Sequence, residues 1–201
     1  MAIVNLKELK PLKELTAKHI QVIEEFEELL EQGISGLTMS DIAATLKVSL
    51  RTLYEIAPSK EHLITSTMDR MLTNIGQEAS ASIQGIQSPL SKLKMYIDIG
   101  YEAVGPRIRK FSTDLSKVRG VEEMLDYHRD YFIARIEELL DEAIEYNEIE
   151  DTDTHVVAIA LGGFPVLLSD YFFEGKTKLK NTHEASAHLV ADLILDSLEQ
   201  K

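Results

Sequence analysis

The run Asp126-Tyr127-His128-Arg129-Asp130 contains side chains that could transfer protons or bind a metal ion. Histidine changes its charge near neutral pH, and a neighbouring carboxylate could accept its proton or share a metal with it. Residues on one face of a helix are three or four positions apart, whereas Asp126, His128 and Asp130 are two apart. On a helix these groups point in different directions, so the spacing argues against a metal site and against an acid-base pair.

The other reactive residue types form no catalytic pattern. The chain contains no cysteine, which excludes disulfides, thiolate catalysis and cysteine-based zinc sites. The remaining histidines are scattered, and no Ser-His-Asp grouping is evident. Gly162-Gly163 is followed by Pro165 and lacks the pattern of a nucleotide-binding loop. We therefore expect neither an enzyme nor a bound cofactor or metal.

The segment from Leu37 to Leu63 has the pattern of a unit that binds duplex DNA. It reads LTMSDIAATLKVSLRTLYEIAPSKEHL and predicts two short helices joined by a tight turn. In such a unit the second helix enters the major groove, with its first residues at the base edges. The residues expected to face inward and hold the two helices together are Ile42, Ala43, Leu46, Val48 and Leu53.

The charge of the chain is the main difficulty for a DNA-binding function. The formal net charge is −13 and the sequence pI is about 4.9, whereas duplex binding depends on lysine and arginine that neutralise phosphates. The first 70 residues are less acidic than the rest, with eight basic and eleven acidic side chains. From Thr38 to Lys60 the net charge is +1, and Lys47 and Arg51 favour DNA binding locally.

The elements that position these residues are predicted to be helices, because apolar residues recur at spacings of three and four. No segment alternates with the period of two that marks a strand. With 201 residues and 44% apolar content, the chain can bury a core without metal or disulfides. Caps and breakers predict about nine helices, at Leu15–Gln32, Thr38–Leu46, Ser49–Ile56, Lys60–Ile83, Leu90–Val104, Pro106–Val118, Val121–Asn147, Thr154–Phe173 and His183–Glu199.

The sequence has no pattern of a signal peptide or of a membrane-spanning helix. The start lacks the apolar run of a signal peptide, and no stretch of about 18 apolar residues could span a membrane. We therefore expect a cytoplasmic protein without membrane association.

Leu12 to Gln32 holds two lysines and six glutamates. These glutamates either form a charged face in water or meet Arg107, Arg109 and Lys110, which follow Pro106.

The segment around the two short helices resembles the DNA-binding domain of the TetR family of transcriptional regulators. The matching residues are Thr38, Ile42-Ala43, Val48-Ser49, Thr52-Leu53-Tyr54 and Pro58-Ser59-Lys60. The chain departs from the family pattern at Lys47 and Arg51, where glycine is frequent, and at Ile56-Ala57, where His-Phe is frequent. The resemblance implies a helix-turn-helix domain over residues 1–58 and a helical domain for ligand binding and dimerisation over residues 59–201.

The resemblance also implies which side chains touch DNA. They fall into a group that contacts phosphates and a group nearest the bases. The phosphate group is Thr38, Thr52, Tyr54 and Lys60, with added positive charge from Lys47, and the base group is Ser49, Leu50 and Arg51.

By the same resemblance, the larger domain encloses a pocket for a small effector. The helices expected to enclose it carry aromatic residues and methionines, which favours an apolar or aromatic molecule. The residues expected to contact the effector are Met95, Tyr101, Phe111, Tyr127, His128, Tyr131 and Phe164.

The last two predicted helices, Thr154–Phe173 and His183–Glu199, carry more apolar side chains than one helix face of a monomer needs. The resemblance implies that they pair with their copies in a second subunit as a four-helix bundle. Gly162, Gly163 and Pro165 interrupt the first of these helices, where small residues permit close helix approach and proline permits a kink. A homodimer would hold two recognition helices about 34 Å apart and bind a palindromic operator.

Two functions are therefore open. The leading interpretation is a dimeric, ligand-responsive repressor that binds double-stranded DNA. The alternative is a carrier of an apolar ligand that has the same fold and binds DNA weakly or not at all. The acidic charge and the missing His-Phe pair favour the alternative.

Overall fold

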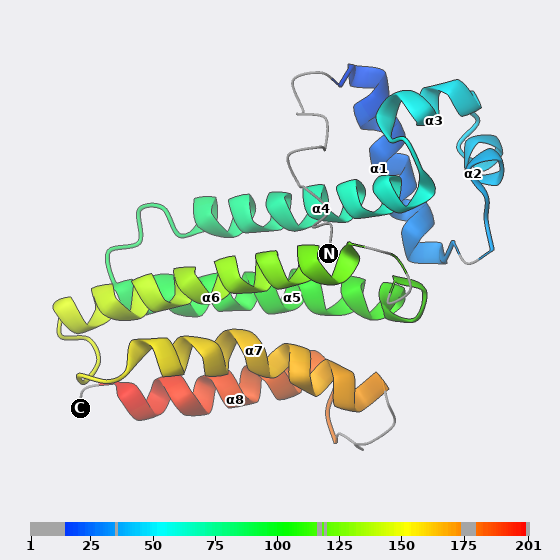
Figure 1. Cartoon of the computed structure of the whole chain (residues 1–201). Helices are drawn as coiled ribbons and strands as arrows, with labels where there is room; N and C mark the ends of the chain where they lie inside the picture. The colour runs from blue at the N-terminus through cyan, green and yellow to red at the C-terminus, as the bar shows by residue number, and fades with distance from the viewer. Residues whose placement is uncertain (1–14, 35, 116–117, 119, 174–179, 200–201) are drawn as a thin grey trace. The chain divides into compact units, whose positions relative to one another are not determined.

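The computed structural model describes residues 15–34, 36–115, 118, 120–173 and 180–199, and for residues 103–115, 169, 170, 172 and 173 it describes the backbone alone. These residues form eight α-helices and no strand (Figure 1). The all-α prediction is confirmed. The helices are α1 (Ala17–Gln32), α2 (Met39–Thr45), α3 (Leu50–Ile56), α4 (Lys60–Ser82), α5 (Pro89–Leu115), α6 (Val121–Glu145), α7 (Thr154–Phe173) and α8 (His183–Leu198).

The helix ends agree with the predicted ones to within two residues except in one place. α5 runs without interruption from Pro89 to Leu115, across Gly105 and Pro106, where the sequence predicts a break between two helices. A proline inside a helix removes a single backbone hydrogen bond, so the bonds on either side can carry the helix past it. The described chain therefore has eight helices where about nine are predicted.

The chain divides into two compact units. Unit 1 consists of Met1–Leu72 and Lys110–Leu125, and unit 2 consists of Thr73–Arg109 and Asp126–Lys201. The division lies later in the chain than the predicted domain boundary after residue 58, because the first half of α4 packs with α1, α2 and α3. The α4 residues buried in that core are Leu63, Ile64, Met68 and Met71. The functional division after residue 58 stays a prediction.

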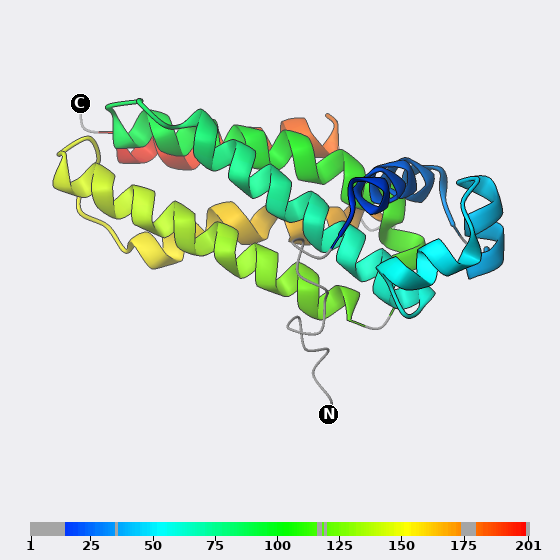
Figure 2. The same cartoon turned by 90° about the horizontal axis from the view of Figure 1, so that it is seen from above.

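Unit 1 has a core formed by the apolar sides of its helices, and α2 and α3 lie side by side in it (Figure 1 and Figure 2). Its completely buried residues include Phe26, Ile42, Leu53 and Leu63. Each of its first three helices begins at a hydroxyl side chain that accepts a backbone hydrogen bond; the caps are Thr16, Thr38 and Ser49. Caps and core packing stabilise α2 and α3, which have seven residues each and would not be stable alone.

The start of α2 is a reciprocal cap, as the spacing of Thr38 and Asp41 predicts. The Thr38 hydroxyl accepts a hydrogen bond from the Asp41 backbone N–H at 3.3 Å. The Asp41 carboxylate accepts hydrogen bonds from the Thr38 hydroxyl at 2.6 Å and from the Thr38 backbone N–H at 2.8 Å. These two bonds, first from the hydroxyl and then from the backbone, lower the pKa of Asp41, so the cap stays charged at neutral pH.

Unit 2 contains the second half of α4, most of α5 and α6, and the whole of α7 and α8, which pack against each other. Its completely buried residues include Leu93, Ile136, Leu139 and Leu140. Across the residues that the structure describes, no helix has the length and hydropathy needed to cross a membrane.

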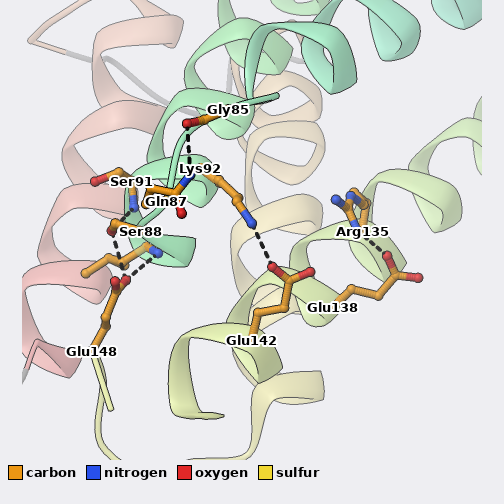
Figure 3. Close-up of polar contacts among 10 residues, drawn as sticks. Gly85, Gln87, Ser88, Ser91, Lys92, Arg135, Glu138, Glu142 and Glu148 are labelled. Atoms are coloured by element: carbon orange, nitrogen blue, oxygen red, sulfur yellow. Dashed lines mark hydrogen bonds and ion pairs between the residues drawn. The ribbon is translucent and has the colours of Figure 1, made fainter. Parts of the chain in front are cut away.

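Two carboxylates bind the start of α5, one from α6 and one from just beyond the end of α6 (Figure 3). Glu148 accepts hydrogen bonds from the Ser88 hydroxyl at 2.9 Å and from the Leu90 backbone N–H at 2.8 Å. It therefore caps α5 from a distant part of the chain. Glu142 on α6 accepts a hydrogen bond from Lys92 on α5 at 3.1 Å. Both contacts set the pairing of α5 with α6 inside unit 2.

Gly162 lets α7 approach α6 closely, as the sequence predicts for this pair of glycines. A Cβ at position 162 would lie 2.4 Å from Cγ1 of Ile133 on α6, which is too close for any side chain. A Cβ at Gly163 would meet no described atom within 4 Å. The two adjacent glycines therefore differ: the first is required for packing inside unit 2, and the second faces open space.

Pro165 lies inside α7 and cannot donate a hydrogen bond to the Leu161 carbonyl four residues earlier, because proline has no N–H. The Tyr101 hydroxyl on α5 donates to that carbonyl instead, at 2.5 Å. Burial raises the pKa of Tyr101 above its ordinary value of 10.0, so the hydroxyl keeps its proton. The Pro165 carbonyl is hydrogen-bonded to Nε2 of His183 on α8 at 2.9 Å. α5 and α8 thus both support the proline segment of α7.

Candidate nucleic-acid interface

The turn between α2 and α3 places a left-handed residue at Lys47, with φ of 54°. The Lys47 N–H donates to the Ala44 carbonyl at 3.2 Å, and the Val48 N–H donates to the Ala43 carbonyl at 3.0 Å. These are the two bonds of a Schellman motif, in which glycine is favoured at the left-handed position. Val48 packs against the core of unit 1, as predicted. The exposed Lys47 side chain therefore stands at the corner that leads into α3.

α3 has one exposed side and one buried side. At about 3.6 residues per turn, the residues that share the exposed side are Leu50, Arg51, Tyr54 and Glu55. The residues that share the buried side are Thr52, Leu53 and Ile56. Because the buried side is packed into the core, the exposed side is held in one orientation relative to the rest of unit 1.

The three residues expected nearest the bases lie together at the start of α3. Ser49, Leu50 and Arg51 are all exposed. The Arg51 side chain keeps 88% of its surface in water, and Leu50 keeps 38%. This turn therefore presents a cation, an apolar group and a hydroxyl on the surface of unit 1.

Thr52 lies on the other side of α3 from these residues. It is only 9% exposed, and its hydroxyl is hydrogen-bonded to the Ser49 hydroxyl at 2.8 Å. Its backbone N–H donates to the same Ser49 oxygen at 3.0 Å. Thr52 therefore supports the cap of α3, and the phosphate contact expected of it stays a prediction. Thr38 and Tyr54 of the same group are exposed.

Lys60 makes hydrogen bonds inside the protein, and the phosphate contact expected of it stays a prediction. Its Nζ donates hydrogen bonds to the carbonyls of Ile34, at 3.1 Å, and Leu37, at 2.7 Å. Both carbonyls lie between α1 and α2, so the ammonium group fixes this connection to the start of α4. Lys60 thereby holds the chain just before Thr38, and its charge is used inside the protein.

The Glu55 carboxylate joins α3 to α1. Its Oε1 accepts a hydrogen bond from Nε of Arg51 at 2.9 Å, and its Oε2 lies 3.6 Å from Nε2 of His19 on α1. Nδ1 of His19 accepts a hydrogen bond from the Thr16 N–H at 3.5 Å, as part of the cap of α1. The bond from Arg51 is the largest cause that lowers the pKa of Glu55, so this side chain is negatively charged at neutral pH.

Glu55 and His19 were not identified as site residues from the sequence. The spacing of Arg51 and Glu55, one helical turn apart, is a signal that would have found the first pair. The contact between Glu55 and His19 joins residues on different helices, and no local pattern predicts it.

Glu24 of α1 has a partner on α4, since Nη2 of Arg70 lies 3.6 Å from its Oε1. The side chains of Arg107, Arg109 and Lys110 lie outside the described residues. The hypothesis that they meet the α1 glutamates therefore stays a prediction.

The residues expected to contact an effector lie in different environments. The ring of Tyr101 is buried, and its centroid lies 6.4 Å from that of Phe132 and 5.3 Å from that of His188. Of these two neighbours, His188 was not identified as an effector contact from the sequence. Of the other expected residues, the exposed ones are Met95, Tyr127 and Tyr131, the half-buried ones are His128 and Phe164, and the side chain of Phe111 lies outside the described residues. The effector contacts stay a prediction.

The acidic run in α6 forms ion pairs on the protein surface. Arg129 lies 2.8 Å from the Asp126 carboxylate and 3.6 Å from the Asp130 carboxylate. Both carboxylates therefore face a cation of their own helix. Within the part of the chain that the structure describes, no three histidine or carboxylate side chains gather as a metal site would require.

A second surface of interest lies on α7 and α8, which expose large apolar side chains. They are Val156, Ile159, Val166, Leu167, Tyr171, Leu189 and Leu193. A contiguous group of large apolar residues in water usually marks an interaction surface. The sequence predicts such a surface on these two helices.

Comparisons with known proteins add to this geometry. Residues 26–67 match the family model described as "Bacterial regulatory proteins, tetR family". No curated protein matches the chain by sequence. Similar solved structures include a transcriptional regulator from Cytophaga hutchinsonii, with 14% identity, coverage of 92% of this chain and 100% of that chain, and a TM-score of 0.76.

Two further structures are similar over the same extent. A TetR transcription regulator from Haloarcula marismortui has 14% identity, coverage of 92% and 100%, and a TM-score of 0.76. The fatty acid degradation regulator FadR from Bacillus halodurans has 16% identity, coverage of 94% and 100%, and a TM-score of 0.70. At these identities the likeness establishes a common fold over nearly the whole chain.

Proposed function

We propose that the chain is a homodimeric transcriptional repressor of the TetR family, because residues 26–67 match that family's model and the fold is that of similar transcriptional regulators. It binds a palindromic operator in double-stranded DNA, and a small apolar or aromatic effector changes its affinity for that operator. Binding to operator DNA implies action in the cytoplasm. No catalytic step is assigned to it.

The observation that carries the proposal is the exposed side of α3. Arg51 is 88% exposed in the first turn of this helix, while the opposite side of the helix is packed into the core of unit 1. A helix held by its buried side and carrying a cation at its start is suited to enter the major groove. Lys47, at the corner before α3, adds a second exposed cation.

The proposed contacts with DNA are assigned from which side chains in and around α3 are exposed. Ser49, Leu50 and Arg51 are proposed to face base edges, because they stand in the exposed first turn. The proposed phosphate contacts are Thr38, Lys47 and Tyr54, which are exposed around that turn. Thr52 and Lys60 act indirectly, since the first supports the cap of α3 and the second fixes the connection before α2.

DNA binding can be tested with operator fragments selected from a random pool by the full-length protein. We expect the affinity for a selected duplex to fall steeply with salt, because phosphate contacts release counterions. Arg51→Ala should weaken it by about tenfold or more, as expected for loss of a base contact. Arg135→Ala is the matched control, since this arginine belongs to unit 2. Equal affinities of wild type and Arg51→Ala would overturn the proposed role of α3.

The homodimer is proposed to form through α7 and α8. Their large apolar side chains are exposed in the single chain, and Gly163 leaves room for close approach of another helix. We expect Leu193→Glu to give a monomer in light scattering, because it places a charge in the covered surface. Tyr146→Glu is a control of equal exposure beyond the end of α6, since Leu193 is 64% and Tyr146 is 66% exposed. A dimer that survives Leu193→Glu would argue for a different interface.

The effector is proposed to be apolar or aromatic. Unit 2 contains buried aromatic contacts, in which the rings of Tyr96 and Phe132 stack at 5.3 Å. One similar structure is that of a fatty acid degradation regulator, and an acyl chain belongs to the same chemical class. A ligand of this class should raise the midpoint of thermal unfolding and change operator affinity. No shift with any member of an acyl and aromatic set would contradict this part of the proposal.

A carrier of an apolar ligand that does not bind DNA is the second candidate. The net charge of −13 and the residues Ile56-Ala57, in place of the family's frequent His-Phe, favour it. The two functions separate in the selection experiment. A carrier would retain no duplex from the pool at low salt but would still bind the ligand.

A further inference from the structure

The exposed side of α3 carries an acidic residue in the middle of its cationic surface. Glu55 lies one turn after Arg51, and its Oε1 accepts a hydrogen bond from Nε of Arg51 at 2.9 Å. The Glu55 side chain is 45% exposed and the Arg51 side chain is 88% exposed. A carboxylate in this position repels phosphate, so it weakens general affinity for DNA.

The second oxygen of Glu55 is held from another helix. Nε2 of His19 on α1 lies 3.6 Å from Oε2 of Glu55. Nδ1 of His19 accepts the hydrogen bond from the Thr16 N–H, which leaves Nε2 as the ring nitrogen that faces Glu55 and can carry an N–H. The His19 side chain is only 14% exposed, so it forms a firm support. Glu55 therefore lies between Arg51 of α3 and His19 of α1.

Arginine has five N–H donors in a planar group. When Nε donates to Glu55, the four donors on the two terminal nitrogens stay available, and the bond restricts the orientations of the guanidinium group. Such a group suits the two acceptors N7 and O6 of guanine in the major groove. A free arginine in the same place would also bind any nearby phosphate, which carries no sequence information.

We infer that Glu55 is a specificity-determining residue of this interface: it positions Arg51 for a guanine edge and opposes contact of Arg51 with phosphate. The inference rests on the proposed function and extends it. It names guanine in each half of the operator as the base that Arg51 contacts. Glu55 itself is a positioning residue, because it acts through Arg51.

The test compares wild type with Glu55→Gln, which removes the charge and keeps the size of the side chain. The probes are an operator duplex selected by the wild-type protein and a scrambled duplex of the same length. We expect Glu55→Gln to bind the scrambled duplex several-fold more tightly and with steeper salt dependence. The ratio of the two affinities should fall by about tenfold.

Two control variants separate this role from charge and from helix stability. Glu28→Gln removes an exposed glutamate from α1 of the same unit and should leave the affinity ratio unchanged. Glu55→Asp keeps the charge but shortens the side chain, so it should lower the ratio as Glu55→Gln does. A ratio lowered by Glu28→Gln to the same extent would overturn the inference, because general charge would then explain the effect.

A modified base gives a readout that a purely structural role would not change. Replacing the operator guanines by 7-deazaguanine removes the N7 acceptor. We expect this to weaken wild type by several-fold, to leave Arg51→Ala unchanged, and to weaken Glu55→Gln less than wild type. If Glu55→Gln discriminates between the duplexes as well as wild type does, the inference is overturned while the proposed function stands. If wild type retains no duplex at all, both are overturned.

Discussion

The hydroxyl of Tyr101 replaces a backbone donor that Pro165 cannot supply, and this contact gives a prediction that can be worked out quantitatively. Tyr101→Phe removes the hydroxyl and keeps the ring against Phe132 and His188. The Leu161 carbonyl then loses the bond recorded for it at 2.5 Å. It lies in α7, four residues before a proline, so no backbone N–H takes the place of the hydroxyl.

A buried polar group left without a partner costs about 1–3 kcal/mol. We therefore expect Tyr101→Phe to lower the free energy of unfolding by that amount. For a chain of this size the thermal midpoint should fall by roughly 2–4 °C for each kcal/mol. Pro165→Ala restores an N–H four residues after Leu161. In that background Tyr101→Phe should cost under about 1 kcal/mol, because the carbonyl keeps a partner.

The assay is urea unfolding, monitored by circular dichroism, of wild type, Tyr101→Phe, Pro165→Ala and the double variant. All four are compared at one protomer concentration, since the stability of a dimer depends on it. The matched control is Tyr146→Phe, which changes a tyrosine that is 66% exposed and should have little effect. If Tyr101→Phe lowers the free energy of unfolding equally in wild type and in Pro165→Ala, the reasoning is refuted, because the Leu161 carbonyl would then not need the hydroxyl.

Three further predictions follow from single features of the structure. Gly162→Ala should lower the free energy of unfolding by about 1–3 kcal/mol, because the added Cβ clashes with Ile133. Gly163→Ala should leave it unchanged or raise it, as measured by urea unfolding of a monomeric variant. Equal losses at both sites would contradict the packing described. The Glu137 carboxylate raises the pKa of His155 above 6.5, so this contact stabilises the fold below pH 6.5 and is lost as the pH rises through the raised pKa. An NMR titration of His155 should give a lower midpoint in Glu137→Gln than in wild type, and an unchanged midpoint would contradict the contact. Lys47→Gly should leave the free energy of unfolding unchanged or raise it by up to about 1 kcal/mol, because φ of 54° favours glycine. It should also reduce the slope of log affinity for DNA against log salt concentration by about one. An unchanged slope would argue against a phosphate contact of Lys47.

Local signals in the sequence predicted most of the helix ends. Thr38 and Asp41 form the expected cap of α2, and Ser49 caps α3. These predictions succeed because a cap depends on residues three positions apart and hardly on the rest of the fold. The break predicted at Gly105-Pro106 was wrong, because one missing hydrogen bond does not end a helix whose neighbouring turns are intact.

Contacts between distant residues could not be predicted in the same way. Lys60 matches the family pattern, but its Nζ binds carbonyls of Ile34 and Leu37, more than 20 residues earlier. Glu55 contacts His19 on another helix. Both side chains could equally have faced DNA on sequence grounds, because the types and spacing of residues do not encode which carbonyl or imidazole a folded chain brings near them.

The acidic charge of the chain and the proposed DNA binding are compatible if local charge decides affinity. At physiological salt the interaction of exposed charges is screened beyond about 8 Å, so acidic residues farther than this from α3 have little influence on a duplex bound there. The segment Thr38–Lys60 has a net charge of +1, and its exposed cations at the interface are Lys47 and Arg51. So few cations give weak binding to phosphates, and discrimination must come from base edges. A carboxylate that lowers general affinity further, as Glu55 does, is then an advantage, because a regulator must find one operator among many other sites.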